Sequence, residues 1–431
     1  MSQSIAKSQY TLMYVASGKT FDDEGWTLAA PNETQAGLVR AIYKKNQLQL
    51  KDSSFGIYTF ADWLPIHKMM QGSYAPQTYK SKGLAKELGL SNLYITFSGY
   101  WPERNIKMRT CSFKETESFS VCSRMDNDEK QVLVVASAGN TARAFAQVCS
   151  DNKIPLLLSV PEDNLNALWF DAPLNDCVKL IASKSGGDYF DAIHLSNIAC
   201  ELEGFLAEGG AKNVARRDGM GTTMLSATTF IGEIPEYYFQ AVGSGTGAIA
   251  AWEANLRLIN DGRFGKRKTK LMVSQNYPFL PIYDAWKEDS RALLPFDDHQ
   301  ARKQVEMIDA KVLSNRKPPY SLAGGLYDAM KDAGGEVLLA TNEEARKAAS
   351  LFSETEGIDI HPAAAIATAS LINTVSKGTI DKESIIMLNI TGGGEERFKK
   401  ENELFYLKPL LTFDVNPNEN EVKEQLSKLQ W

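Results

Sequence analysis

Apolar runs that lead through small-residue loops into helix-compatible stretches recur along the chain. The first run is QVLVV (131–135), which passes through ASAGN into TARAFAQVCS and then into a second run, IPLLLSV (154–160). A short helix between two apolar runs is typical of a βα unit, in which the chain returns to a neighbouring parallel strand. The pattern therefore predicts two parallel strands here.

The same order recurs twice towards the C-terminus. YYFQAV (237–242) leads through GSGTG into AIAAWEANLRLIN and the run TKLMVSQN, and SIIMLNI (384–390) leads into TGGGEERF. Ligands of open α/β sheets bind at the carboxyl ends of the strands, so these three loops are expected to converge on one crevice. The predicted fold class is α/β, and DNDEK (126–130), NRKPPYS (315–321) and the polar tail from Asn416 are candidate linkers.

Composition narrows the class of protein. The chain has 431 residues, of which 43% are hydrophobic and 23% charged, and its formal net charge is −6; this favours a folded protein of two or three lobes and disfavours nucleic acid as a partner. The longest apolar runs are far shorter than the roughly 18 residues that cross a membrane. Five cysteines without a C-x-x-C pair indicate reduced thiols, so a cytoplasmic location is expected.

Gly243-Ser244-Gly245-Thr246-Gly247 stands between a predicted strand and a predicted helix. Its glycines would let backbone N–H groups approach an anion at the positive end of the helix, and the two hydroxyls suit a terminal phosphate. A turn that needs glycine for packing alone is an equal alternative at this point. A dinucleotide-binding loop is a third, although Asp261 lies before the next strand and not at its end, where a ribose would require an acid.

Lys114 follows a predicted helix start. Ser112 would be the N-cap residue, with Glu115 as its capping-box partner, which places Lys114 in the first turn. There the helix dipole and partial burial both disfavour an ammonium, so a neutral, nucleophilic amine is accessible near neutral pH. The alternative is a solvated surface lysine beside glutamates, which is the commoner role of a lysine.

Other candidate residues surround these two motifs. Ser137-Ala138-Gly139-Asn140-Thr141 opens a predicted helix and offers N–H groups, hydroxyls and an amide to a carboxylate, or else serves only as an N-cap. Arg104, Lys107 and Arg109 form a short basic cluster, either a solvated face or an anion site. Cys111 has no histidine near it in sequence, and we interpret it as a packing residue.

Four short motifs, in their order along the chain, resemble the motifs of the fold-type-II pyridoxal-phosphate (PLP) enzymes. They are S-F-K, S-A-G-N-T, G-S-G-T-G and T-G-G-G. I-H-P-A-A-A-I-A (360–367) is similar to the helix before the last strand in threonine synthases. Longer strings are similar to the threonine-synthase-like branch that makes L-cysteate from O-phospho-L-serine and sulfite. They are SGYWPER, TCSFKE, ASAGNTARAFA, ARRDGMGT, EYYFQAVGSGTGAIAAWEA and PPYSLAGGLYDA.

The resemblance implies a role for each motif. Lys114 would bind the cofactor as a Schiff base and then move the Cα proton, while Gly243, Ser244, Gly245, Thr246 and Gly247 would bind the cofactor phosphate. Asn140 would contact the ring hydroxyl, and Thr391 the pyridine nitrogen. Ser137, Ala138, Gly139 and Thr141 would bind the substrate carboxylate. The leaving group and the nucleophile are both anions, so cationic side chains are expected to bind them. The candidates are Arg104, Lys107, Arg109 and the pair Arg216-Arg217.

The resemblance also implies two three-layer α/β/α domains with the cofactor between them. We expect residues 1–121 and 216–431 to form the larger domain, residues 122–215 the smaller one, and two chains to form a homodimer. Threonine synthases usually continue S-F-K-D-R-G, whereas this chain continues Lys114-Glu115-Thr116-Glu117. This difference leaves the substrate less defined than the cofactor. Threonine synthase, cysteine synthase and a non-catalytic ligand sensor of the same fold are the alternatives. We predict no structural metal, because the N-terminal C-x-x-C found in relatives is missing here.

Overall fold

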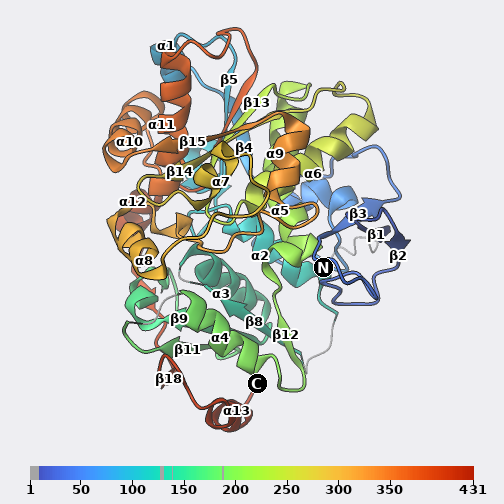
Figure 1. Cartoon of the computed structure of the whole chain (residues 1–431), viewed down its shortest axis with the longest axis vertical. Helices are drawn as coiled ribbons and strands as arrows, with labels where there is room; N and C mark the ends of the chain where they lie inside the picture. The colour runs from blue at the N-terminus through green and yellow to red at the C-terminus, as the bar shows by residue number, and fades with distance from the viewer. Residues whose placement is uncertain (1–8, 127–130, 138, 187–188) are drawn as a thin grey trace.

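A computed structural model describes residues 9–126, 131–137, 139–186 and 189–431. Two sheets, each covered by helices on both faces, divide the molecule into an upper and a lower part in Figure 1. Helix α2 (Lys114–Arg124) packs against α3 (Asn140–Asn152) of the lower part and α5 (Val214–Ile231) of the upper part. The residue at the start of α2 is therefore well placed to belong to a site between the two parts.

The larger sheet has six strands in the order β15-β14-β13-β16-β5-β4, parallel except for the edge strand β4. From one edge to the other these are Glu336–Ala340, Lys270–Asn276, Tyr237–Ala241, Ile386–Ile390, Leu93–Phe97 and Gln77–Lys80. Their buried side chains alternate between two cores, so that Tyr238 and Phe239 point to opposite faces of the sheet. The parallel pairing of β13 with β14 confirms the prediction for residues 237–242 and the run that follows them.

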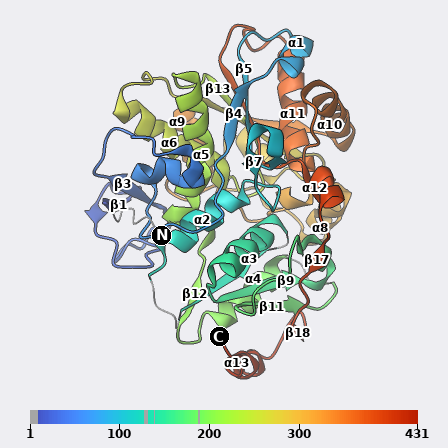
Figure 2. The same cartoon turned by 180° about the vertical axis from the view of Figure 1, so that it is seen from behind.

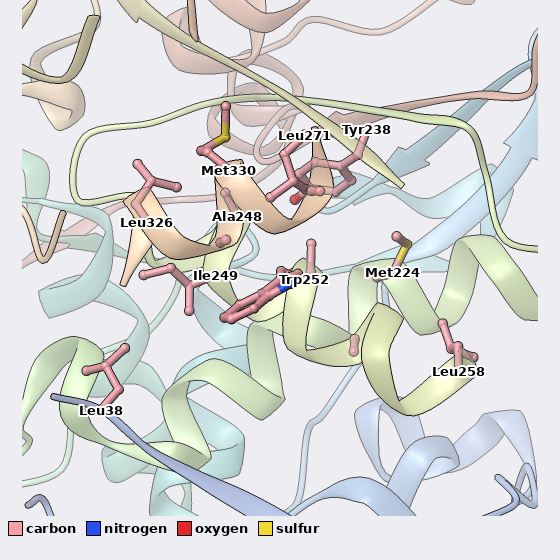
Figure 3. Packing of buried hydrophobic residues seen from close by; sticks show 14 of the residues in the cluster. Leu38, Met224, Tyr238, Ala248, Ile249, Trp252, Leu258, Leu271, Leu326 and Met330 are labelled. Carbon is pink, nitrogen blue, oxygen red and sulfur yellow. The ribbon is translucent and has the colours of Figure 1, made fainter. Parts of the chain in front are cut away.

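Different helices cover the two faces of this sheet. One face carries α11 (Pro362–Ser376) and, outside it, α10 (Asn342–Glu356). The other carries α5, α6 (Thr246–Asp261) and α9 (Leu326–Ala333). Figure 3 shows how Ala248, Ile249 and Trp252 of α6 pack among side chains of the sheet, α5 and α9. This packing fixes the start of α6 at the carboxyl end of β13.

The smaller sheet has five parallel strands in the order β12-β8-β9-β11-β18. They are Phe205–Ala207, Val132–Ala136, Leu156–Pro161, Val178–Ser183 and Leu411–Phe413. Side chains of β8 alternate between a core shared with α3 and a core shared with α4 (Tyr189–Ala199). The predicted parallel strands 131–135 and 154–160 are thus confirmed as β8 and β9.

The C-terminal tail is structured, contrary to the prediction of a linker from Asn416. After β18 the chain forms α13 (Glu419–Ser427), which packs on α4 through the buried side chains of Val422 and Leu426. Figure 2 shows this helix beneath the smaller sheet, close to the C-terminus. Both β18 and α13 therefore lie on the smaller sheet, outside the residue range 122–215 that we expected for the smaller domain.

The N-terminal segment adds a small antiparallel sheet in the order β2-β1-β3, formed by Thr20–Phe21, Tyr10–Tyr14 and Val39–Tyr43. Its buried side chains join the core around α6, and Figure 2 shows it at the side of the larger part. Among the described residues, no helix combines the length and apolarity that crossing a membrane requires.

Candidate active site

Lys114 begins α2 directly beside the glycine-rich loop that follows β16. Ser112 forms an antiparallel bridge with Gly392, and the Phe113 N–H donates to the Thr391 carbonyl at 2.9 Å. On the other side of this bridge, the Gly393 N–H donates to the Cys111 carbonyl at 3.1 Å. Two predicted motifs nearly 280 residues apart in sequence thus meet through backbone hydrogen bonds.

The predicted capping box at Ser112 and Glu115 is wrong, although Lys114 does lie in the first turn. The N-cap residue is Phe113 and makes no side-chain capping bond. Ser112 is drawn instead into the bridge with Gly392, and the Glu115 carboxylate accepts from the N–H and the hydroxyl of Thr110, at 2.6 and 2.9 Å. The glutamate therefore fixes the loop before the helix and does not cap the helix itself.

The Lys114 amine stands in a largely enclosed, charged environment. Its side chain is 21% exposed, and Nζ lies 3.2 Å from Oε2 of Glu117, whose side chain has no exposed surface. Burial lowers the pKa of the Lys114 amine below its ordinary value, the nearby Glu117 opposes this, and Arg216 adds to it. A lowered pKa makes the neutral, nucleophilic amine more accessible, as the sequence analysis predicts for this position.

Glu117 links Lys114 to the two helices on either side of α2. Its Oε1 accepts from the Thr141 hydroxyl at 3.1 Å, at the start of α3, and lies 3.3 Å from the guanidinium of Arg216 on α5. Arg216 in turn donates two bonds of 2.7 Å to Glu208. The structure therefore brings the predicted residues Lys114, Thr141 and Arg216 into one network, and it adds two carboxylates that the sequence analysis missed.

Asn140 is the first residue of α3, and a buried arginine holds its amide. Oδ1 of Asn140 accepts from Arg143 at 3.0 Å, which leaves the amide N–H₂ group, the donor end, for another partner. Next to it, the Ser137 hydroxyl accepts from the Gly139 N–H at 3.2 Å. Ala138 lies outside the described residues.

Arg143 connects this loop to the other two motifs. Its guanidinium donates to the Thr110 carbonyl at 2.9 Å, lies 3.3 Å from the Glu395 carboxylate and stacks on the Trp169 ring at 3.9 Å. Thr110 precedes the Lys114 motif, and Glu395 directly follows the T-G-G-G loop. Sequence reasoning placed Arg143 in a helix but had no signal for this role, because its partners are distant in sequence.

The 243–247 loop also lies near Lys114. Phe113 forms a buried cluster with Ala250, one turn into α6, and Met220 of α5. The Ser244 and Thr246 hydroxyls are 2.9 Å apart at the helix start, where the first N–H groups of a helix have no partner within it. Backbone donors, hydroxyls and the helix dipole therefore coincide, which is a suitable environment for a phosphate.

The glycines of this loop also have a packing role. A Cβ at Gly243 would lie 2.9 Å from Leu313 Cα, and one at Gly247 would lie 2.5 Å from the Gln240 amide; Gly245 has φ +78°. Packing and phosphate binding are therefore compatible explanations and do not exclude each other. Asp261, the acid considered for a dinucleotide ribose, instead accepts from the Leu48 N–H at 2.8 Å and pairs with Arg263.

The other basic candidates have partners elsewhere. Arg109 pairs with Asp171 and Asp151, and Arg104 stacks on the Tyr79 ring at 3.8 Å and on the Trp101 ring at 4.5 Å. Lys107 lies exposed on the short strand β7 (Ile106–Lys107). Arg217 is buried against Glu253. Of the basic candidates, Arg216 is thus the one that the structure brings to Lys114.

Two further predictions concern sulfur and metal chemistry. Cys111 is fully buried beside Trp169 and Phe398, in agreement with a packing role, and burial raises the pKa of its thiol. Within the described part of the chain, no three His, Cys, Asp or Glu side chains gather in a way that could hold a metal ion.

Comparison with known proteins identifies the class. Residues 77–392 match the family described as "Pyridoxal-phosphate dependent enzyme". Among solved structures, maize serine racemase is 15% identical with a TM-score of 0.56, covering 74% of this chain and 88% of its own. Threonine deaminase isoform 2 from Solanum lycopersicum is 17% identical with a TM-score of 0.55, covering 86% and 93%. The chain belongs to the pyridoxal-phosphate-dependent enzymes of fold type II, and its cofactor is PLP.

Relatives of higher identity define its place within that family. Cysteate synthase from Methanosarcina mazei is 46% identical over 94% of this chain and 96% of its own length. Cysteate synthase from Methanocella paludicola is 45% identical over 98% of both chains. The chain is therefore a member of the cysteate synthase group of these enzymes, which makes it an enzyme and not a ligand sensor.

The residues present fit the cofactor. An enclosed lysine with a lowered pKa provides the amine that its aldehyde requires, and the start of α6 provides donors for its phosphate. Ser112, beside Lys114, has a buried hydroxyl without a hydrogen-bond partner in the structure. Such a hydroxyl is available to a bound ligand, because a buried polar group without a partner is costly.

Proposed function

We propose that this enzyme is a cysteate synthase, which replaces the β-phosphate of O-phospho-L-serine with sulfite and releases L-cysteate and phosphate. The proposal is supported by near-full-length identity of 44–47% to cysteate synthases. The observation that carries the chemistry is the enclosed Lys114 amine, which lies between the loop after β16 and the start of α3.

The predicted residue roles can be assigned to these positions. When bound, PLP withdraws electrons from the substrate Cα, which permits proton loss there and departure of the β-phosphate. Lys114 would bond the cofactor aldehyde and, once the substrate amine has replaced it, remove the Cα proton. Residues 243–247 would hold the cofactor phosphate, Asn140 its ring hydroxyl and Thr391 its ring nitrogen.

Substrate contacts are assigned to the start of α3 and to basic side chains. Ser137, Gly139 and Thr141 would bind the substrate carboxylate through N–H and hydroxyl donors. Arg216 is favoured for the leaving phosphate and the incoming sulfite, since it lies in the same network as Lys114. Arg104 and Arg109, also predicted for this role, contact aromatic rings and carboxylates outside this network. A homodimer and a cytoplasmic location remain part of the proposal.

Mass analysis of the products tests the substrate. The enzyme is offered O-phospho-L-serine and O-phospho-L-homoserine separately, with and without sulfite. Cysteate formed only from phosphoserine and sulfite supports the proposal. Phosphate release from phosphoserine that does not depend on sulfite, without cysteate, contradicts it, and threonine formed from phosphohomoserine would indicate a threonine synthase instead. In Lys114→Ala, the visible absorption band of the bound cofactor and product formation should both be lost.

A further inference from the structure

Glu117 is a buried carboxylate within reach of the Lys114 amine, and the proposed reaction gives it no role. It lies one helical turn after Lys114 on α2, on the same face. Its two oxygens serve different partners: Oε2 faces the amine at 3.2 Å, whereas Oε1 contacts Thr141 and Arg216. The carboxylate thus fixes three side chains of the site, each from a different helix.

The charges around the amine come from several elements. Glu117 lies on α2, Arg216 on α5 and Glu208 after β12. Tyr189 lies on α4, and the same three charges act on the pKa of its hydroxyl. Arg216 disfavours a second positive charge beside it, and Glu208 already pairs with Arg216 at 2.7 Å. Among the described residues, Glu117 is the carboxylate that contacts the amine directly, so it is the main group that stabilises an ammonium there.

We propose that Glu117 is a positioning residue for Lys114: its carboxylate holds the amine at the start of α2 and, against the effect of burial, favours its protonated form before the cofactor aldehyde arrives. The inference rests on the assignment of Lys114 as the cofactor lysine. Only the neutral amine adds to an aldehyde. Glu117 therefore raises the pH at which the cofactor becomes attached, while Thr141 and Arg216 keep the carboxylate itself in place.

The direction of the effect follows from the charges. Burial lowers the pKa of the Lys114 amine and Glu117 raises it. Removing the Glu117 carboxylate leaves burial and Arg216, which lower the pKa of the amine, and Glu208, which raises it as the smallest of these causes. An opposite charge at this distance typically shifts a pKa by about 1 to 3 units. The midpoint of attachment should therefore move to lower pH by at least about one unit in Glu117→Gln.

The experiment follows attachment and not catalysis. Full-length protein freed of cofactor is mixed with PLP over a series of pH values, and borohydride is added after a short fixed time. The neutral amine adds to the aldehyde with loss of water, and borohydride then reduces the resulting C=N bond, so each attachment leaves a stable phosphopyridoxyl group. Mass spectrometry of peptides gives the modified lysine and the fraction modified at each pH.

Two further variants complete the comparison. Glu115→Gln is the matched control, because Glu115 is also a buried carboxylate of α2 but bonds Thr110 and not Lys114. Its midpoint should equal that of the wild type. Glu117→Asp keeps the charge but withdraws it by one methylene, so its midpoint should lie between those of the wild type and Glu117→Gln. It also provides the test if Glu117→Gln fails to fold.

The outcomes separate this inference from the proposed function. Label on Lys114 with a midpoint lowered in both Glu117 variants, and unchanged in Glu115→Gln, supports the inference. Label on Lys114 with the wild-type midpoint in the Glu117 variants, or with an equal shift in Glu115→Gln, overturns the inference and leaves the role of Lys114 intact. Label on a different lysine in the wild type overturns the assignment of Lys114, and the inference with it.

Discussion

The two strand-end loops at the site are held in different ways. The loop after β13 (243–247) is fixed by shape: the sites of its missing Cβ atoms are filled by Leu313, Leu326 and Gln240, and its internal side-chain bond joins two neutral hydroxyls. In the loop after β8, residues 139–141 are held by charge, since Asn140 bonds to Arg143 and Thr141 to Glu117.

This difference suits the two tasks proposed for the loops. Among the described residues, neutral groups hold residues 243–247 in place. The Thr246 N–H donates to the Ser244 hydroxyl at 3.3 Å, and the other N–H groups of the loop stay available to an anion. The charged loop is joined through Glu117 to the reactive amine, so it responds to a change in protonation there. The comparison predicts that substitutions on the charged side have larger effects on stability and stronger pH dependence.

The largest effect is expected for Arg143→Met, which keeps much of the side-chain volume but removes the buried guanidinium. The Thr110 and Ala167 carbonyls and Asn140 would lose a donor, while Glu395 would keep His361 and Lys399. Breaking a buried ion pair costs about 3 to 5 kcal/mol, and the remaining partners of Glu395 favour the lower end of this range. Urea unfolding should show a loss of about 3 kcal/mol.

Arg109→Met provides the control for this variant. Arg109 also has carboxylate partners, but its side chain is 33% exposed, and exposed pairs contribute about 1 kcal/mol or less. Equal losses in the two variants would show that burial of the charge network around Asn140 is not what stabilises that loop.

A pH-dependent effect is expected from Glu115. Burial raises the pKa of its carboxyl from 4.5 to about 7. Because the native pKa lies above the unfolded one, the native state binds this proton more tightly. The associated stability is fully present below about pH 4.5 and is lost as the pH rises through 7, a difference of about 3 kcal/mol.

Glu115→Gln removes this titration and serves as its measurement. The unfolding free energy of the wild type minus that of Glu115→Gln should fall by about 3 kcal/mol between pH 4.5 and pH 8. Urea unfolding of both proteins at four or five pH values measures it. A difference that is constant with pH would mean that Glu115 titrates as an ordinary exposed glutamate.

Gly243→Ala tests the side held by shape. The new methyl group would meet backbone atoms, Leu313 Cα and the Val312 carbonyl oxygen, both at 2.9 Å. Backbone cannot move aside cheaply, so a cost of about 1 to 3 kcal/mol is expected. At Gly247 the obstacle is the end of the Gln240 side chain, and Gly247→Ala should cost less. Thermal unfolding of both variants tests the order, and the reverse order would contradict packing against the 312–313 backbone.

Much of the fold follows from local patterns in the sequence. Strands β8, β9, β13, β14 and β16, with helices α3 and α6, lie within about two residues of their predicted positions, because each combines an apolar run with a glycine-rich or polar end. The C-terminal helix α13 was not predicted, because its sequence contains just two apolar side chains, Val422 and Leu426. These become buried when the helix packs against α4.

The site could be predicted only in part. The motif residues are local, and the structure places Lys114, Thr391 and Thr141 together. The error at Ser112 came from a partner far along the chain, Gly392, which competes with a local cap. Glu117 and Arg143 look like surface charges on their helices, and their burial results from α5 and Trp169 packing over them. Contacts between segments that are distant in sequence cannot be predicted from the periodicity of either segment.

The smallest effect comes from one substitution made in both loops. Thr141→Val removes a hydroxyl that donates to the buried Glu117 carboxylate, whereas Thr246→Val removes one that pairs with the neutral Ser244 hydroxyl. Both threonines lie in the first turn of a helix, so the change in helix propensity is matched. A hydrogen bond to a charged group contributes about 1.5 to 3 kcal/mol and a neutral one about 0.5 to 1.5. Urea unfolding should therefore show a loss larger by about 1 kcal/mol in Thr141→Val, and equal losses would mean that charge does not distinguish the two loops.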